Sequence, residues 1–315
     1  MSFWDRFGPD YRRNCMAWRH SPANPVIPPV GDGWKSRWTA NPDVLEHDGR
    51  RLLYYRGNGV LGDDPALHDR IGVAEIVELT GESITLRDLG DGPAVDVGAP
   101  GAFDSQDVLD PAAVRFRGAT WLYYSAVGDG PDSVGLAVSA DGVHFEKRGK
   151  VLTGRAPDVV VRHGRIYMLF QEKAANGRYD FRLAVSEDGQ RFEPAVAGPV
   201  LEPAGESGWD SYDINTGRLI DTGDGYLLIY GGSSSLLDQP DYFGLARSTD
   251  LIHWERHPGN PIFGCGPKGA EDGGAIWFPA LVQTDDAYVL LYEGSRGNYR
   301  SDLSSQICMA SIDRA

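Results

Sequence analysis

Residues 208–231 read GWDSYDINTGRLIDTGDGYLLIYG, and the pattern of this stretch recurs along the chain. It predicts a loop, a strand, a tight turn at Gly223-Asp224-Gly225 and a second strand that ends in aromatic residues. The same order of features is found in residues 33–57, 101–126, 155–171 and 271–294. Internal repetition of this kind indicates a fold built from one repeated unit.

A second pattern follows the first in most of the units. It is clearest in residues 135–147 (GLAVSADGVHFEK), 182–193 (RLAVSEDGQRFE) and 244–255 (GLARSTDLIHWE), and residues 71–86 carry a weaker version. Apolar and polar residues alternate on both sides of a turn, which predicts a hairpin of half-buried strands. The turn acids Asp141, Asp188 and Asp250 are therefore expected to be structural. Each unit is expected to hold four strands, and residues 61–70, 174–180 and 233–242 are expected to be inserted loops.

The last unit lacks one strand, which the N-terminus is expected to supply. Its third strand is predicted at residues 306–312 (QICMASI), close to the end of the chain. Residues 16–29 (MAWRHSPANPVIPP) are similar to the outer-strand stretch 254–263 (WERHPGNPIF). A strand from the N-terminus would close the ring and remove a free sheet edge. We therefore predict an all-β, five-bladed β-propeller with four antiparallel strands per blade, as a single domain over residues 1–315; an open β-sandwich is the alternative.

Charge and composition narrow the classes of partner. The 315 residues carry a formal net charge of −15, which argues against nucleic acid or an anionic membrane surface and fits a neutral ligand. The three cysteines, Cys15, Cys265 and Cys308, lack the spacing of a metal site, so we expect free thiols. The N-terminus has no apolar signal region and no run reaches transmembrane length. These features predict a cytoplasmic protein; they do not predict its oligomeric state.

The expected mouth of the central channel is rich in carboxylates, aromatic residues and amides. Inner strands of a propeller line the channel, and the loops before them converge at one mouth. From the first to the fifth unit these positions hold Trp38, Asn41, Asp43, Asp104, Asp107, Asp110, Asp158, Asp210, Tyr212, Asp213, Asn215, Glu271, Asp272 and Trp277. Glycosidic cleavage needs one protonated acid and one ionised carboxylate, and aromatic faces stack on sugar rings. The pattern therefore favours a carbohydrate as substrate.

Repetition separates structural from functional candidates. Asp110 breaks the repeat, because its equivalents are Asn41, Ala156, Thr216 and Phe278, and this favours a functional role. Asp104 and Asp210 recur before Ser, so they are expected to cap loops. Trp34 and Trp209 also correspond, and blade packing competes with sugar binding for both. Ligand contacts are further expected from the residues that end second strands: Arg56, Gln171 and Glu293.

The motifs G-W-D-S, D-G-Y-L-L-I-Y, G-L-A-x-S-x-D and N-P-V-I or N-P-I-F resemble those of the five-bladed propeller glycosidases. These include glycoside hydrolase families 32, 43, 62, 68, 117 and 130, and the resemblance covers nearly the whole chain. Leu109-Asp110-Pro111 resembles both the Asp-Pro of family 32, whose Asp stabilises the transition state, and the Glu-Asp-Pro-Arg of family 130, whose Asp donates the proton. Ala112 stands where family 130 has the Arg. In Asn41-Pro42-Asp43 and Ala156-Pro157-Asp158 the acid follows the proline, whereas family 43 has it before.

The resemblance implies a glycoside hydrolase that acts on a short oligosaccharide or glycoside, of furanoside or pentoside type. Inversion by paired carboxylates is expected, with Asp43 or Asp110 as base, Asp158 or Asp213 as modulator, and Glu271 or Asp213 as acid. The expected substrate-binding residues are Trp38, Asn41, Arg56, Asp107, Gln171, Trp209, Tyr212, Asp272, Trp277 and Glu293. No cofactor is required, although the resemblance to family 43 allows a calcium ion in the channel. Two alternatives remain, a phosphorylase that uses Arg56, Arg155 or Arg218, and a sugar-binding propeller without activity.

Overall fold

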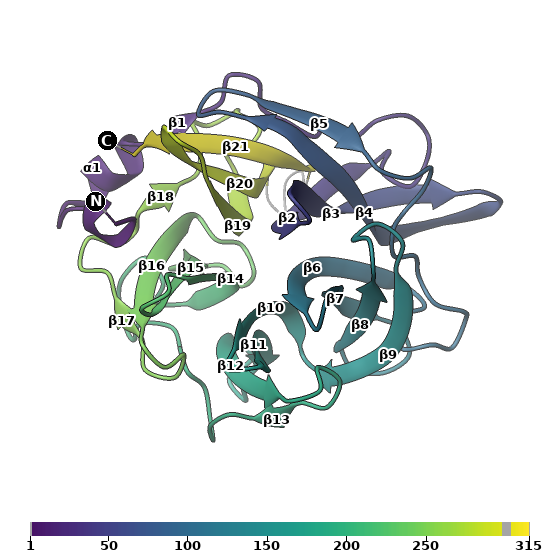
Figure 1. Cartoon of the computed structure of the whole chain (residues 1–315). Helices are drawn as coiled ribbons and strands as arrows, with labels where there is room; N and C mark the ends of the chain where they lie inside the picture. Colours follow the sequence, from purple (N-terminus) through teal and green to yellow (C-terminus); the bar gives the residue numbers. More distant parts are fainter. Residues whose placement is uncertain (1, 298–303, 315) are drawn as a thin grey trace.

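Five antiparallel sheets form a ring in the computed structural model, which describes residues 2–297 and 304–314 (Figure 1). Each sheet is one blade, and the first strand of each blade lies nearest the central axis. The first blade holds β2 (Trp38–His47), β3 (Arg50–Leu61), β4 (Asp64–Leu79) and β5 (Ile84–Asp88). The second holds β6 (Asp107–Phe116), β7 (Ala119–Val127), β8 (Ser133–Ser139) and β9 (Glu146–Thr153). The third holds β10 (Arg155–Arg162), β11 (Arg165–Lys173), β12 (Tyr179–Ser186) and β13 (Glu193–Pro194). The predicted five-bladed propeller is confirmed.

The last blade is built from both ends of the chain. The fourth blade holds β14 (Asp213–Asp221), β15 (Tyr226–Ser233), β16 (Tyr242–Ser248) and β17 (Glu255–Arg256), with β18 (Phe263–Gly264) also paired to β16; the fifth holds β19 (Ala275–Gln283), β20 (Ala287–Ser295), β21 (Ser305–Asp313) and β1 (Arg19–His20). β1 pairs with β21, as the N-terminal repeat predicts, and the two chain ends lie side by side (Figure 1). Before β1 come a short 3-10 helix, η1 (Trp4–Arg6), and α1 (Tyr11–Met16). Among the described residues no helix has the length and apolar character that crossing a membrane requires.

The hydrophobic core is divided among the interfaces between neighbouring blades. Successive side chains of a strand point to opposite faces, so each second strand serves two interfaces. In β3, Leu53 and Tyr55 pack against β20 and β21 of the fifth blade. Leu52 and Tyr54, from the same strand, pack against the second blade. Burial on both faces explains why these strands read as nearly continuous apolar runs.

One of the expected loops is a hairpin instead. Residues 61–70 belong largely to β3 and β4, which continue to a turn at Gly62-Asp63. The polar sequence of this segment obscures the strands, because this end of the hairpin is exposed. Residues 234–241, between β15 and β16, do form a loop, and it reaches the candidate site described below.

An acid, a tyrosine and a basic side chain recur where chain segments enter the blades. The buried Asp accepts hydrogen bonds from the tyrosine hydroxyl and the basic side chain in three trios: Asp104, Tyr124 and Lys147; Asp210, Tyr230 and Arg256; and Asp272, Tyr292 and His20. Asp104 and Asp210 are thus structural, as the repeat suggests. Asp272 is predicted from the sequence to bind substrate, but the structure makes it the third member of this set.

The first blade holds the same trio with its charges reversed. Lys35 takes the place of the Asp, and its ammonium donates to the Tyr55 hydroxyl, 3.1 Å away, and to Asp88 on the outer strand. Lys35→Asp alone would place two carboxylates together, and we expect it to lower the free energy of unfolding by about 1 kcal/mol. Adding Asp88→Lys produces the Asp–Tyr–Lys order of the second blade and should restore part of that loss. Urea unfolding of the two single variants and the double variant tests this, and strictly additive effects would contradict it.

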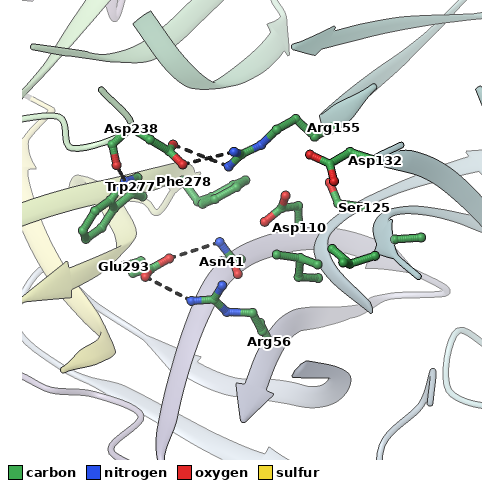
Figure 2. Close-up of a pocket in the computed structure, with 13 residues that line it drawn as sticks. Asn41, Arg56, Asp110, Ser125, Asp132, Arg155, Asp238, Trp277, Phe278 and Glu293 are labelled. Atoms are coloured by element: carbon green, nitrogen blue, oxygen red, sulfur yellow. Dashed lines mark hydrogen bonds and ion pairs between the residues drawn. The ribbon is translucent and has the colours of Figure 1, made fainter. Parts of the chain in front are cut away.

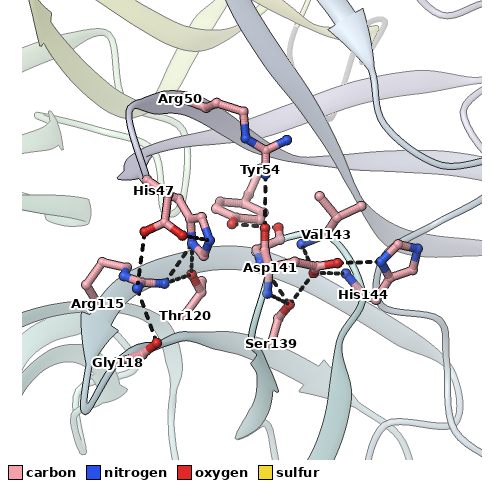
Figure 3. Close-up of polar contacts among 12 residues, drawn as sticks. His47, Arg50, Tyr54, Arg115, Gly118, Thr120, Ser139, Asp141, Val143 and His144 are labelled. Atoms are coloured by element: carbon pink, nitrogen blue, oxygen red, sulfur yellow. Dashed lines mark hydrogen bonds and ion pairs between the residues drawn. The ribbon is translucent and has the colours of Figure 1, made fainter.

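A buried histidine joins the first and second blades at the ends of β2 and β7 (Figure 3). Nδ1 of His47 lies 2.8 Å from both Thr120 Oγ1 and Arg115 Nη1, and Nε2 lies 3.3 Å from Asp48 Oδ2. An arginine can only donate, so Nδ1 accepts and the ring is neutral with its hydrogen on Nε2. Burial and the charge of Arg115 lower the pKa of His47, and Asp48 opposes them.

This arrangement predicts a pH-dependent loss of stability. Because the folded-state pKa is lowered, the unfolded chain binds more protons than the folded one below about pH 6.5, and stability falls as the pH drops. Gln at this position retains an acceptor and a donor but does not titrate. We therefore expect the wild type to lose more stability than His47→Gln between pH 7.5 and pH 5.5 in urea unfolding. Parallel losses in both proteins would show that His47 is not the titrating group.

Candidate functional site

Each inner strand is interrupted at the same repeat position by a residue with left-handed backbone. Asn41, Asp110, Ala156, Thr216 and Phe278 have φ between 46° and 54°, and strand pairing skips a position there. Such a bulge redirects the side chain of the strand. Four of the five precede a proline, which has no N–H to offer the ladder, and the fifth precedes Gly217. Non-glycine residues are uncommon in this region of φ, and strained backbone concentrates at functional sites.

Three of these redirected side chains line a pocket of about 230 Å³ at one mouth of the ring. Asn41, Asp110 and Phe278 come from the bulges, and the other charged or polar lining residues are Arg56, Ser125, Asp132, Arg155, Asp238, Trp277 and Glu293. Arg56, Ser125 and Glu293 hold equivalent positions near the ends of β3, β7 and β20. Loops supply Asp132 and Asp238. The pocket therefore draws on every blade.

Asp110 has a carboxylate oxygen that no other described residue binds. Its side chain is directed into the pocket between Arg155 on one side and Asn41 and Arg56 on the other (Figure 2). The residue is buried, and within residues 2–297 and 304–314 Oδ2 has no hydrogen-bond partner. Burial raises the pKa of Asp110, while Arg155 and the Ser125 hydroxyl oppose the rise. A carboxyl group in this environment retains its proton to higher pH than an exposed aspartate.

Glu293 is held by donors that favour its charged form. One oxygen accepts from Asn41 Nδ2 at 3.1 Å, and the other accepts from Arg56 Nη2 at 3.3 Å (Figure 2). The second oxygen also accepts from the Ser305 hydroxyl. Burial raises the pKa of Glu293, whereas Arg56 and Ser305 lower it and the charge of Asp110 raises it further. Two carboxyl groups thus share the pocket in different environments, one with an unpartnered oxygen and one with three donors.

Asp238 connects three blades above the pocket. Its carboxylate pairs with Arg155 at 3.1 Å, its N–H donates to Asp213 Oδ2 at 2.7 Å, and its carbonyl accepts from Trp277 Nε1 at 3.0 Å. The loop between β15 and β16 is thereby fixed against the inner strands. The same contacts hold Arg155 and Trp277 in the pocket lining (Figure 2).

Comparisons with known proteins find the fold and not a family. No protein-family model matches the sequence, and no curated protein matches it. Solved structures do match: β-1,2-mannobiose phosphorylase from Listeria innocua in complex with β-1,2-mannobiose (16% identity, TM-score 0.71, covering 94% of this chain and 96% of that one) and a glycosyl hydrolase from Bacteroides ovatus (17%, 0.72, 93% and 92%). A third comes from work on glycoside hydrolases of family 130 that target β-1,2-mannosidic linkages in Candida mannan (19%, 0.70, 94% and 94%). At these identities the likeness shows a shared five-bladed propeller.

Two of the predicted catalytic acids lie in the channel beneath the pocket. Asp43 and Asp158 hold equivalent positions, two residues after a bulge residue, and neither lines the pocket. Asp43 Oδ2 accepts from the N–H of Ala113 in the next blade, and Asp158 Oδ2 accepts from that of Leu219. Burial raises the pKa of both carboxyl groups, and Arg218 opposes the rise. These contacts link adjacent blades around the axis.

The channel residues do not fit a calcium ion. Arg218 Nη1 pairs with Asp158 at 3.1 Å, and its positive charge acts on Asp43 as well, so a cationic side chain already occupies this part of the channel. Within residues 2–297 and 304–314, no group of three His, Cys, Asp or Glu side chains is placed to hold a metal ion. The channel calcium suggested by the resemblance to family 43 therefore has no matching ligand set in this part of the chain.

The other acids and ligands predicted from the sequence lie outside the pocket lining. Asp213 is buried, and burial raises its pKa to about 6, but it binds the pocket loop through the Asp238 N–H. Glu271 pairs with Arg296 and Gln306.

Trp38 and Asp107 contact Asp69, which lies 3.6 Å from Arg56. The remaining three are Gln171, bonded to the Ile214 carbonyl; Tyr212, under the Arg178 guanidinium; and Trp209, packed on Tyr230, Gly232 and Gly244.

Five charged, polar or aromatic lining residues are absent from the predicted catalytic and binding residues: Ser125, Asp132, Arg155, Asp238 and Phe278. Ser125 could have been found, because it is the repeat equivalent of Arg56 and Glu293. Phe278 is the repeat equivalent of Asp110, and Arg155 enters the sequence argument as a possible phosphate ligand. Asp132 and Asp238 lie in loops, where the repeat does not predict which side chain turns inward.

Proposed function

We propose that this protein is a glycoside hydrolase. The observation that carries the proposal is the buried carboxyl group of Asp110, directed with an unpartnered oxygen into a pocket that also holds Glu293 and two aromatic rings. Glycosidic cleavage uses two carboxyl groups kept in different protonation states by their surroundings. Burial raises the pKa of both Asp110 and Glu293, but only Glu293 accepts hydrogen bonds from three side chains, so the surroundings of the two carboxyl groups differ. The fold shared with glycoside-active propellers supports the same reading.

The environments of the two carboxyl groups suggest their roles. Asp110 is the general acid, because burial raises its pKa and so favours the protonated form to higher pH, and because its free oxygen faces the ligand space. Glu293 is the base, because Arg56, Asn41 and Ser305 stabilise its carboxylate. This assignment differs from the roles predicted for Asp43, Asp158, Asp213 and Glu271 from the sequence. It retains Asp110 as a catalytic residue but makes it the acid, whereas the sequence predicts it as a candidate base. Inversion remains our proposed stereochemistry.

Pocket size and charge limit the substrate. A volume of about 230 Å³ is below the range of roughly 300–1,000 Å³ for drug-sized ligands, and it suits a single sugar ring at the end of a chain. The lining holds four carboxyl groups and two arginines, which favours a neutral sugar over an anionic one. Pentosides and furanosides remain candidates, and the β-1,2-mannosides bound or targeted by structural neighbours join them.

A phosphorylase is the second candidate, because Arg56 and Arg155 both line the pocket beside Asp110. Phosphorolysis needs cationic groups to hold phosphate next to the sugar. Each arginine already faces a carboxylate, Glu293 and Asp238 respectively, which weakens its attraction for a dianion. Hydrolysis is therefore favoured.

A substrate panel tests the proposal. Purified protein is assayed on nitrophenyl pentosides, furanosides and mannosides and on short oligosaccharides that include β-1,2-mannobiose, with and without inorganic phosphate. We expect turnover without phosphate, and its loss in Asp110→Asn. Turnover that requires phosphate would identify a phosphorylase. Binding of a panel sugar without turnover would favour the non-catalytic alternative.

A further inference from the structure

We propose that Arg218 is a positioning residue that holds Asp110 in its catalytic conformation, an inference that rests on the proposed function of Asp110. Arg218 lies in the channel beneath the pocket, is 4% exposed and does not line the pocket. It touches the backbone immediately after Asp110, and its substitution should therefore act through that residue.

The guanidinium group binds the backbone next to two pocket residues. Nη2 donates to the carbonyl of Pro111 at 2.9 Å and to that of Pro42 at 3.1 Å. Pro111 directly follows Asp110, and Pro42 directly follows Asn41. One nitrogen thus joins the bulges that direct the proposed acid and a ligand of Glu293 into the pocket.

The remaining contacts of Arg218 reach two further blades. Nη1 donates to Asp158 Oδ1 at 3.1 Å and to the carbonyl of Pro157 at 3.5 Å. The guanidinium carbon lies 5.2 Å from the centre of the Phe278 ring, which lines the pocket from the fifth blade. A side chain of the fourth blade therefore contacts the inner strands of the other four.

The bulges explain why these carbonyls need a donor. The pairing of β6 with β7 skips Asp110 and Pro111, so the strand ladder does not hold the backbone at this point. A buried carbonyl without a donor is unfavourable, and Arg218 supplies the donor. The repeat equivalents of Arg218 are Asp43, Ala112, Asp158 and Ala280, so small residues in the second and fifth blades leave room for its side chain.

Lysine at position 218 would retain the positive charge but not the fixed arrangement of hydrogen-bond donors. A guanidinium is a planar fork with several fixed donors, whereas an ammonium is a compact charge on a flexible stem. Arg218→Lys cannot reproduce the bonds from two separate nitrogens to carbonyls of three blades. We expect the bulge at Asp110 to shift and proton donation to the leaving group to weaken.

Leaving-group dependence separates positioning from a general structural role. Phenyl and 2,4-dinitrophenyl glycosides of the sugar identified by the panel are compared, because dinitrophenolate departs without a proton and phenolate needs one. For Arg218→Lys we expect kcat to fall at least about tenfold on the phenyl glycoside and to stay within about threefold on the dinitrophenyl glycoside. Arg70→Lys is the matched control, since Arg70 is a buried arginine bonded to Asp96 and the Gly59 carbonyl outside the pocket. It should show no such dependence.

The outcomes distinguish this proposal from the proposed function. Equal losses on both glycosides would overturn the role of Arg218, whereas full activity of Asp110→Asn would overturn the role of Asp110 itself.

Crystal structures of the wild type and Arg218→Lys give a readout without activity: a displaced Pro111 carbonyl and Asp110 carboxylate are expected, and an unmoved Asp110 contradicts the proposal. If Arg218→Lys does not fold, Asp158→Asn loosens one of its contacts and should give a smaller loss with the same leaving-group dependence; an equal loss on both glycosides would again overturn the proposal.

Discussion

Asp110→Asn is expected to lower kcat about 10²–10⁴-fold on glycosides with poor leaving groups. Asparagine keeps the size of the side chain and tolerates the left-handed backbone found at this position, where φ is 54°. The fold should persist, and only the transferable proton is lost. Steady-state kinetics on the phenyl glycoside, with circular dichroism as a check on folding, measure this effect. A variant that retains more than about a tenth of wild-type kcat would exclude Asp110 as general acid.

The stability of the wild type and that of Asp110→Asn should depend differently on pH. Burial raises the pKa of Asp110 above that of an aspartate in the unfolded chain, so the folded protein holds a proton that the unfolded chain releases. The free energy of unfolding of the wild type should therefore fall as the pH rises from the pKa of the unfolded aspartate to the raised pKa of folded Asp110. Asp110→Asn has no proton to lose and should show no such fall. We expect the variant to be the more stable protein at pH 8, and wild-type activity to decline on the alkaline side as the acid ionises.

Glu293→Ala is expected to lower kcat by a similar factor of about 10²–10⁴ and to respond to added azide. Removing the carboxylate leaves space beside Asn41 and Arg56 into which a small anion can enter. If Glu293 acts on the face of the sugar opposite the leaving group, azide should restore turnover and yield a glycosyl azide with inverted configuration. Product analysis by NMR measures both the rescue and the configuration.

A matched control for this experiment is Glu271→Ala. Glu271 lies outside the pocket lining and pairs with Arg296, so its removal should change kcat by less than about twofold. NMR of the wild-type product then separates inversion from retention. A glycosyl azide of retained configuration from Glu293→Ala would show that Glu293 acts on the same face as the leaving group and would reverse the two roles.

The repeat predicts the fold well, because the sequence of each blade independently carries the same strand pattern. Tight turns, alternation and the displaced N-terminal strand predict five blades and the closure of the ring, and the structure has both. The sequence does not predict the hairpin at residues 61–70, because its tip is exposed and polar side chains there remove the alternation that marks a half-buried strand.

The candidate site is less predictable, because a bulge changes the direction of a side chain without a strong sequence signal. Asp110 stands out in the sequence as the acid that breaks the repeat, and it lines the pocket together with four residues that the sequence predicts as substrate ligands, Asn41, Arg56, Trp277 and Glu293. Asp43 and Asp158 follow a bulge by two residues and lie one layer deeper in the channel. Asp238 depends on the path of a loop, which local sequence does not determine.

The closure of the ring has a consequence for synthesis of the chain on the ribosome. Arg19 and Asp313 form an ion pair although they are 294 positions apart, so the first strand made must wait for the last. At roughly 5–20 residues per second, the interval is about 15–60 s. During this time an unpaired edge could join a wrong partner, and the hazard grows with strand length. A closing strand of two residues, Arg19–His20, keeps that exposure small until its partner strand β21 has been synthesised.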